Sequence, residues 1–459
     1  MPLISISSIE DSSPKIMLTF EEMERFGLKP GDLVAVRAGS TVTEAEIETS
    51  QTGNHISIGT LRALGLPMVK FMMLKKESSL SLQVGPLVGI MVSRGKKYKH
   101  PPYSSQGRLL YNFLGYSNHV NYLTYVFTPE EVDIVNRTIS GFFLDTGLDG
   151  QSHWRQHKFP LPDVVYNRIL YRSIETKRLT KQITSFLSNS KNIKYFNPKF
   201  LNKWETNTIL SQNPKLSAHL PVTKKYEGPA EMVNFLAEFN TVYLKPVHGS
   251  LGKGILRLSL QPDGYAYTHR EGKKTVTGIW HTPDEFGSGL KKYTYDKPYI
   301  MQQGLDLLKY RGRVFDIRVL MQKNGEGRWV DTAIVVRVGP EGGIFPNVAA
   351  GGEPKSIESI WSELTSEDWL TSRTYLLTKQ VCLISADMLE NSLGTFAEIG
   401  LDIGVDEAGN VWIIEINSKP SRKVFPKDQL HLKRTSIKLP IDFAAYLAGF
   451  TPDKEQNLP

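Results

Sequence analysis

The pattern of hydrophobic and polar positions divides the chain into three regions. Residues 1–82 contain short apolar stretches that Pro and Gly interrupt about every eight to twelve positions, as in LKPGDLVAVRAGS and ISIGTLRALGLP. We interpret both stretches as strands bounded by turns. Such evenly spaced strands predict a small β-barrel-like N-terminal domain, with a break expected at Gln83–Gly85.

The second region, residues 83–197, is expected to alternate strands with helices. It opens with VGPLVGIMV, a continuous apolar run typical of a strand that is buried in a parallel sheet. Further strands are expected in NYLTYVF, DVVYNRIL and IKYFNP, and helices in SSQGRLLYNFLGYSNHV and near Ile174–Leu187. The alternation predicts a parallel α/β domain over about 84–197.

The third region, residues 198–450, changes from helix to antiparallel strands. Residues 198–220 are expected to be helical, with Asn202 as the N-cap. Hairpins are predicted around Asn324–Gly327 and Asp406–Asn410, and a helix over about Asp368–Asn391. Together the three regions predict a multidomain protein of mixed α/β and α+β class.

Composition and charge narrow the class of protein. The 459 residues are 40% hydrophobic and 22% charged, which excludes wholesale disorder, collagen and coiled coil. Lys and Arg exceed Asp and Glu by 55 to 47, a net charge of +8. This excess is mild over so long a chain, so we expect a solvated basic surface and not nucleic-acid binding, while local cations suit phosphate-bearing small molecules.

Cysteine use and apolar run length point to a cytoplasmic location. The single cysteine, Cys382, cannot form an internal disulfide, which excludes a disulfide-stapled secreted scaffold. No apolar run approaches the 18 or so residues of a membrane span, and the N-terminus has no signal-peptide pattern. We therefore expect no membrane association.

A glycine-rich loop, HGSLGKG at 248–254, is the first stretch with candidate chemistry. Its three glycines allow backbone N–H groups to approach phosphate oxygens, and Lys245 precedes it on a strand. The residues after it alternate as a strand, which excludes a Walker loop and a Rossmann turn, since both need a helix there. Two interpretations remain: a flap over phosphates between antiparallel strands, or a plain tight hairpin.

The last predicted hairpin carries three oxygen-bearing side chains. Glu415 and Asn417 share one face of their strand, and closing the turn at about 407–410 sets Asp402 beside Glu415. Two adjacent carboxylates repel one another unless a cation lies between them, and Mg²⁺ prefers such oxygen ligands. The alternative is a solvated strand end.

Taken in order, the motifs NK, LKP, GSLGKG, QQGL, FDIRV, VVRVG, GLDIG and EIN resemble the ATP-grasp superfamily, and the whole chain resembles its endospore coat-associated YheC/YheD type. The motifs span about half of the chain, residues 198–425. The resemblance implies an ATP-grasp domain of two α+β lobes over 198–450, with a nucleotide flap lobe at about 222–305.

The resemblance also implies roles for individual residues. Lys203 and Lys245 match the lysines that contact the nucleotide, and the strand after residue 300 matches the one whose backbone reads adenine. Relatives commonly have Glu at the position of Gln303, so the adenine contact is only partly matched. The residues that the resemblance assigns to ATP are Lys203, Lys245, Gly249, Ser250, Gly252, Lys253, Gly254, Gln302, Gln303 and Leu305.

Five further residues match the reacting end of the family's site. Arg318 and Arg337 match cations near the γ-phosphate and the developing acyl phosphate, and are our catalytic residues. Asp402, Glu415 and Asn417 match the ligands of Mg²⁺, with two ions expected. Relatives usually have one small residue between this Asn and a following Ser-Pro, whereas NSKP places Ser418 and Lys419 there, so the acceptor site is expected to differ.

The implied function is an ATP- and Mg²⁺-dependent ligase that joins a carboxylate to an amine through an acyl phosphate. The two substrates are unidentified, with a peptide or protein among the options, and spore coat proteins are expected partners. Two alternatives stay open: a phosphotransferase on the same fold, and a nucleotide-binding structural coat protein.

Two other signals carry less weight. His153 and His157 stand four positions apart and could share a helix face, but no third metal ligand has matching spacing, so structural histidines are favoured. Cys382 lies in an apolar helical stretch and is expected to be buried and not reactive.

Overall fold

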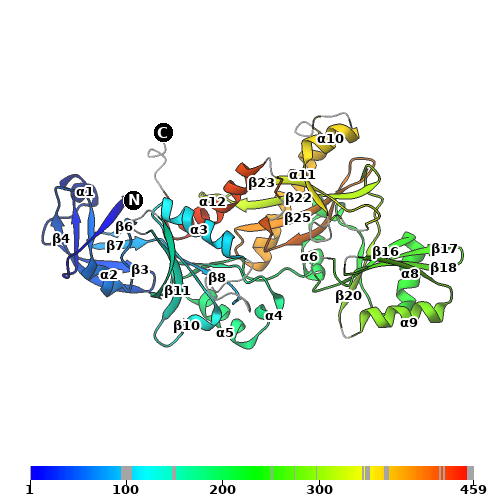
Figure 1. The fold of residues 1–459 in the computed structure, drawn as a ribbon, viewed down its shortest axis with the longest axis horizontal. Helices are drawn as coiled ribbons and strands as arrows, with labels where there is room; N and C mark the ends of the chain where they lie inside the picture. The colour runs from blue at the N-terminus through cyan, green and yellow to red at the C-terminus, as the bar shows by residue number, and fades with distance from the viewer. Residues whose placement is uncertain are drawn as a thin grey trace.

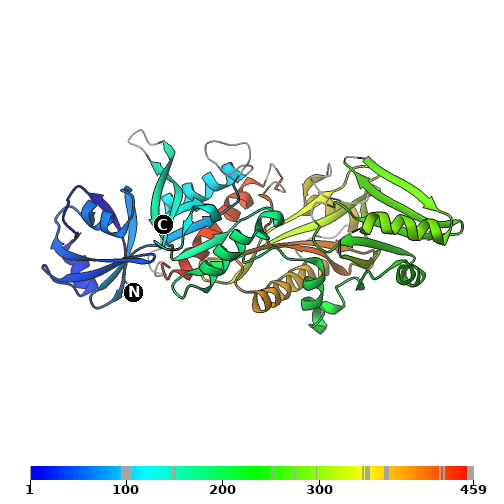
Figure 2. The same ribbon diagram turned by 90° about the horizontal axis from the view of Figure 1, so that it is seen from below.

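The protein is built from four β-sheets that follow one another along its long axis (Figure 1), and Figure 2 shows the same succession after a quarter turn. The N-terminal sheet lies at one end of the molecule, and the sheet that contains β16 to β18 lies at the other. The computed structural model describes residues 2–94, 106–146, 151–249, 252–272, 274–295, 297–343, 346, 352–365, 368, 372–422, 425–426 and 429–451.

The first sheet is a closed barrel with strand order β1-β5-β2-β4-β3-β7-β6. Alternate side chains point inward and fill it with Ile, Leu, Val and Met. The predicted break at Gln83–Gly85 is wrong, because these residues complete β7 and pair with β6. The strands are β1 (Leu3–Ile9), β2 (Lys15–Leu18), β3 (Leu33–Ala38), β4 (Thr41–Thr49), β5 (His55–Ser57), β6 (Phe71–Ser78) and β7 (Ser81–Gly85).

The barrel also contains two helices that the expectation of strands alone missed. They are α1 (Phe20–Phe26) and α2 (Ile58–Leu64), and the latter lies in the ISIGTLRALGLP stretch. The Thr19 and Ser57 hydroxyls accept N-cap hydrogen bonds, and each helix ends at a glycine with positive φ. These caps are local signals, but seven-residue helices are too short to show a clear apolar period.

The second sheet is mixed, so the prediction of a parallel sheet over 84–197 is wrong for three of its seven strands. β8, β9, β13 and β14 are parallel neighbours, whereas β10, β11 and β12 add antiparallel pairs at one side. The strands are β8 (Leu87–Met91), β9 (Leu123–Phe127), β10 (Val132–Asp133), β11 (Thr138–Thr146), β12 (Ser152–Pro160), β13 (Val164–Asn167) and β14 (Lys194–Phe196).

The helices of this unit are α3 (Gly107–His119), α4 (Arg172–Glu175) and α5 (Arg178–Asn189). His153 and His157 lie on β12 and not on a helix, so they are separated by four residues of extended chain. At about 3.3 Å per residue this places their Cα atoms roughly 13 Å apart. One metal ion cannot bind both, which agrees with the structural interpretation.

The third sheet is entirely antiparallel, with order β15-β20-β16-β17-β18-β19. Helices α8 and α9 contribute Phe235 and Phe286 to its apolar core. The elements are β15 (Thr223–Lys225), α8 (Pro229–Phe239), β16 (Thr241–Pro246), β17 (Leu256–Gln261), β18 (Gly264–Glu271), β19 (Lys274–Trp280), α9 (Pro283–Thr294) and β20 (Tyr299–Gln303).

The fourth sheet is antiparallel and is covered by helices. Its strand order is β24-β23-β22-β25-β26, with β21 beside β22. The predicted helix over 198–220 is two short helices, and Asn202 does cap the first of them. The elements are α6 (Lys203–Leu210), α7 (Pro214–Ser217), β21 (Lys309–Tyr310), β22 (Arg313–Lys323), β23 (Trp329–Val338), β24 (Glu353–Ser356), α10 (Ile357–Thr365), α11 (Arg373–Leu393), β25 (Glu398–Val405), β26 (Val411–Asn417) and α12 (Leu430–Leu447).

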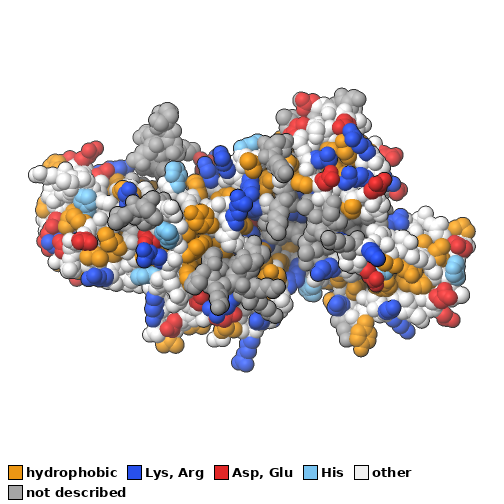
Figure 3. All heavy atoms as spheres, in the orientation of Figure 1, with side chains coloured by type: hydrophobic (Ala, Val, Ile, Leu, Met, Phe, Trp, Pro, Cys, Tyr) orange, Lys and Arg blue, Asp and Glu red, His pale blue; other side chains and the backbone are white. Residues whose placement is uncertain are grey.

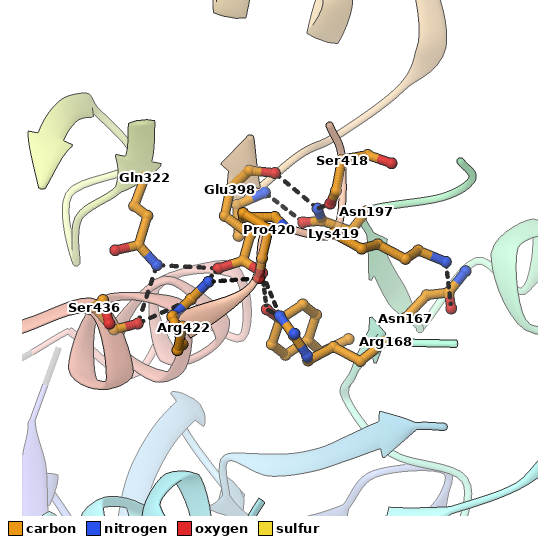
Figure 4. A network of polar contacts seen from close by, with 12 residues as sticks. Asn167, Arg168, Asn197, Gln322, Glu398, Ser418, Lys419, Pro420, Arg422 and Ser436 are labelled. Atoms are coloured by element: carbon orange, nitrogen blue, oxygen red, sulfur yellow. Dashed lines mark hydrogen bonds and ion pairs between the residues drawn. The ribbon is translucent and has the colours of Figure 1, made fainter. Parts of the chain in front are cut away.

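Buried polar contacts join the second sheet to the fourth (Figure 4). Glu398 of β25 is fully buried and forms ion pairs with Arg168, which follows β13, and with Arg422, which precedes α12. Tyr166 and Gln322 donate further hydrogen bonds to the same carboxylate. Within the described residues, no helix is both long enough and apolar enough to cross a bilayer.

Candidate functional site

The predicted register of the last hairpin is confirmed. Asp402 of β25 lies directly opposite Glu415 of β26, and Gly400 lies opposite Asn417. Directly opposed residues project to the same face of an antiparallel pair, and Glu415 and Asn417 alternate on that face. The three oxygen-bearing side chains therefore face one side of the sheet, next to a bulge between Asp402 and Ile403.

Asp402 is held by two buried guanidinium groups. Arg318 Nε donates to Asp402 Oδ1, and Arg337 Nη2 lies 2.9 Å from Asp402 Oδ2. Arg337 also pairs with Asp316 through its Nε at 2.7 Å. The catalytic pair predicted from sequence thus meets one metal-ligand candidate, and Asp316, which sequence reasoning passed over within the FDIRV motif, completes the cluster.

The charge state of this cluster follows from its neighbours. Burial alone raises the pKa of the Asp402 carboxyl, but Arg318 and Arg337 outweigh burial and lower it. Burial raises the pKa of Asp316, and the neighbouring Asp402 charge adds to this against the effect of Arg337. Asp402 therefore stays anionic, as a ligand for a cation must be.

Two lysines lie near the acidic hairpin. Lys203 Nζ lies 3.1 Å from Glu415 Oε1 and donates to the Gly249 carbonyl at 3.1 Å. Lys245 is buried on β16 and donates to Gln302 Oε1. Burial and the nearby Lys203 lower the pKa of Lys245 to about 8. The pocket between the third and fourth sheets is lined by Leu201, Lys203, Thr206, Asn207, Leu210, Leu220, Ile300, Gln302, Ile413, Ile414, Glu415 and Ile416.

The glycine-rich loop connects two antiparallel strands, β16 and β17, so no helix follows it. Gly249 packs so closely on Pro246 that an added Cβ would lie 2.6 Å from the Pro246 ring. Gly252 and Gly254 have φ of 71° and 74°, a region that other residues rarely adopt. Lys253 is exposed on the loop, and Ser250 lies outside the described residues.

The strand expected to read adenine uses most of its backbone in the sheet. β20 lies between β15 and β16, and the Gln303 N–H donates to the Val222 carbonyl at 2.9 Å. Both ends of the Gln302 amide are also committed, to Lys245 and to Thr223. Among the three predicted positions, Leu305 is the one whose backbone N–H makes no hydrogen bond to a described residue.

The structure adds a second cluster that sequence reasoning did not assign. Lys419 is buried, and its Nζ lies 3.1 Å from Glu175 Oε1 and 4.4 Å from the centre of the Phe200 ring. Burial lowers the pKa of Lys419 to about 8, against the effect of Glu175. Arg172 stacks on the same ring at 4.9 Å and donates to the carbonyl of Leu201, a pocket residue. The NSKP motif was the only local signal for this cluster.

Comparison with known proteins identifies the family. The model of the YheC/D like ATP-grasp family matches residues 192–447, which is more than half of the chain. The chain belongs to this ATP-grasp family.

Two curated YheC/D relatives come from Bacillus subtilis (strain 168). Endospore coat-associated protein YheD is 27% identical over 374 residues, covering 80% of each chain. Endospore coat-associated protein YheC is 26% identical over 298 residues, covering 64% of this chain and 81% of that protein. Members of the ATP-grasp family bind ATP with Mg²⁺ and are typically ATP-dependent ligases.

Solved ATP-grasp enzymes are similar at lower identity. D-alanyl-alanine synthetase A from Vibrio cholerae is 12% identical with a TM-score of 0.45, covering 80% of this chain and 99% of that chain. The ATP-grasp ligase PsnB, complexed with a minimal precursor, Mg and ADP, is 14% identical with a TM-score of 0.39, covering 74% of this chain and 91% of that chain.

The donor set of this ATP-grasp chain fits Mg²⁺. The described residues contain no group of three His, Cys, Asp or Glu that could hold a metal. Two carboxylates and the amide oxygen of Asn417 nevertheless share one face, which suits a hard cation that keeps several waters. Glu415 Oε2 makes no hydrogen bond to a described residue, so it can accept a metal while Oε1 faces Lys203.

Proposed function

We propose that the protein is an ATP- and Mg²⁺-dependent ligase that activates a carboxylate for attack by an amine. The observation that supports this best is the pocket in which Lys203 of α6 pairs with Glu415 of β26, while the charges of both act on the buried Lys245 of β16. A triphosphate needs cations, and a magnesium ion needs anions beside them. Lys203 Nζ and Glu415 Oε1 supply such a cation and anion 3.1 Å apart.

The lysines and the loop are assigned to the nucleotide. Lys203 and Lys245 contact its phosphates, and the glycine-rich loop, with Gly249, Ser250, Gly252, Lys253 and Gly254, covers them and excludes water. Leu305 supplies a backbone N–H for the adenine ring, while Gln302 and Gln303 act through the strand that positions it. The flap lobe, at about 222–305, carries this loop.

The acidic hairpin and the two arginines are assigned to the reacting phosphate. Asp402, Glu415 and Asn417 hold Mg²⁺, which neutralises charge on the transferring phosphoryl group when bound, and the site is expected to take two ions. Arg318 and Arg337 orient Asp402 in the structure, and their guanidinium groups supply positive charge on the same face.

The reaction balances as two displacements. A carboxylate oxygen of the first substrate attacks the γ-phosphorus, the bond from phosphorus to the bridging oxygen breaks, and ADP leaves with an acyl phosphate formed. The amine nitrogen of the second substrate then attacks the acyl carbon, and phosphate leaves as the nitrogen loses a proton. Positioning and charge neutralisation suffice for both steps, since no protein nucleophile takes part.

Glu415→Gln tests the metal and nucleotide site. ADP release with hydroxylamine as the amine and a panel of amino acids as the acids should fall by about 100-fold or more, because one anionic ligand of the cation is lost. Glu407→Gln is the matched control, since Glu407 is an exposed carboxylate in the turn of the same hairpin. Equal ADP release from Glu415→Gln and wild type would refute the assignment.

The trapped product separates the reaction classes. A ligase yields a hydroxamate of the acid, whereas a phosphotransferase yields a stable phosphorylated product. A structural coat protein would bind ADP with Mg²⁺ in calorimetry and release no ADP from ATP above background. The names of the Bacillus relatives support a further proposal, that the chain acts in the cytoplasm during spore formation and associates with the spore coat.

The domain division expected from sequence is proposed here as well. The expected units are 1–82, 83–197 and 198–450. Because β7 ends at Gly85, we propose 1–85 and 86–197 for the first two.

A further inference from the structure

A groove runs between α3 and α12, and it shares no lining residue with the pocket between the third and fourth sheets. Its α3 side carries Tyr111, Gly115 and Tyr116, and its α12 side carries Leu430 and Ile437. The lining positions are spaced by four on α3 (111 and 115, 112 and 116) and by three and four on α12 (430, 433 and 437), so each helix turns one continuous face toward the groove. Tyr111 and Leu430 are 42% and 54% exposed, which leaves apolar surface open to a ligand.

Gly115 forms part of the floor of this α3–α12 groove. A Cβ built on Gly115 would meet no atom within 4 Å, and the residue lies in the middle of a regular helix. Glycine there costs about 1 kcal/mol of helix stability relative to alanine. Contacts within the chain do not require this glycine, whereas close approach of a bound partner would.

The rim of the groove is positively charged. Lys433, Arg434 and Lys438 of α12 line it, and none of them forms an ion pair with a described carboxylate. Asp442, also on α12, accepts a hydrogen bond from Tyr116 of α3 at 2.7 Å. Figure 3 shows Lys and Arg side chains beside hydrophobic ones near the middle of the molecule, where α3 and α12 lie.

We propose that the α3–α12 groove binds an acidic amphipathic helix of a partner protein. Apolar side chains of that helix would pack on Tyr111, Gly115 and Ile437, and its carboxylates would pair with Lys433 and Arg434. Helix-in-groove recognition of this kind uses apolar anchors spaced by three and four residues. A second copy of this chain fits less well, because each copy carries a net charge of +8.

Peptide display against the full-length protein tests the proposal directly. A random library of peptides about 16 residues long, long enough for four helical turns, is selected on the wild type. Selected peptides should carry net negative charge and apolar residues at i, i+3, i+4 and i+7. Their dissociation constants are then measured by fluorescence anisotropy.

Two variants localise the binding. Gly115→Leu adds a side chain whose Cβ meets no atom within 4 Å, and it should preserve or raise the melting temperature while weakening binding about tenfold or more. The double variant Lys433→Glu, Arg434→Glu should weaken it similarly and remove its salt dependence. The matched control is Lys291→Glu, Lys292→Glu, two exposed lysines in the last turn of α9, which should bind as wild type.

Several outcomes would overturn the proposal. They are the absence of selected binders, neutral or basic consensus peptides, and binding that survives in Gly115→Leu. Binding to vesicles of phosphatidylserine that depends on the groove, without any peptide binding, would replace the partner helix with a membrane. None of these readouts needs ATP turnover, so failure here leaves the proposed ligase function untouched.

Discussion

Glu398→Gln is expected to destabilise the junction between the second and fourth sheets severely. One oxygen of Glu398 accepts hydrogen bonds from Tyr166 and Arg168, and the other accepts from Gln322 and Arg422 (Figure 4). Glutamine has the same shape but offers only one oxygen. Its NH₂ group would then face donors from the remaining pair.

The magnitude follows from the burial of the two cations left behind. The side chains of Arg168 and Arg422 are 2% and 5% exposed, so water cannot replace the lost carboxylate. Breaking such a buried pair by removing one partner costs about 3–5 kcal/mol. At about 2–4 °C per kcal/mol for a unit of 150–250 residues, the melting temperature should fall by about 6–20 °C.

Thermal unfolding followed by tryptophan fluorescence and by circular dichroism measures this shift. Glu363→Gln is the control, because Glu363 pairs with Arg311 on the surface and exposed pairs contribute little. A Glu398→Gln protein that melts within about 2 °C of wild type would show that the two guanidinium groups do not depend on this carboxylate.

Three further predictions concern the site and the core. The affinity for an ATP analogue, measured by calorimetry, should fall as pH rises above about 8. Lys245 loses its proton near that pH, so the phosphates lose a cation. Constant affinity from pH 7 to 9.5 would contradict this role. Gly249→Ala should weaken the same binding without changing the melting temperature, because its Cβ forces the loop away from Pro246. Cys382 should resist thiol labelling until the protein unfolds, because burial holds the thiol pKa well above its ordinary value. Rapid labelling of the native protein would show that the helix opens.

Acid should act on the same junction. Burial raises the pKa of Glu398, but Arg422 and Arg168 outweigh burial and lower it below that of an unfolded glutamate. A depressed pKa contributes stability above the unfolded value of about 4.3, and this stability is lost as pH falls through the folded value. Wild type should therefore lose stability below about pH 4.5, measured by urea unfolding, and Glu398→Gln should lose less over the same range.

Much of the candidate site was predictable because hairpins are local. The turn at Asp406–Asn410 sets the register that brings Asp402 opposite Glu415. The strand that follows the glycine-rich loop likewise showed that no helix N-terminus lies there. The roles of these residues stay predictions until ligand binding and turnover are measured.

The elements that the sequence did not predict lie where local sequence signals are weak or fit a helix and a strand equally well. Residues of β11 and β12 were not recognised as a hairpin, so the second sheet seemed parallel throughout. Helices α1 and α2 are only seven residues long, and their apolar positions fit a strand about as well as two helical turns. Such segments are distinguished as helices by their N-cap and C-cap residues.

The sequence by itself determined the two hairpins of the C-terminal region and the face that carries the acidic residues. Periods of two and of three to four residues, together with turn residues, are properties of short segments. Only the tertiary structure decided which distant groups neutralise one another. Arg168 and Glu398 are 230 positions apart, and Lys419 meets Glu175 across 244 positions. No local pattern encodes such pairs, because their energy depends on burial that exists only after the sheets have packed.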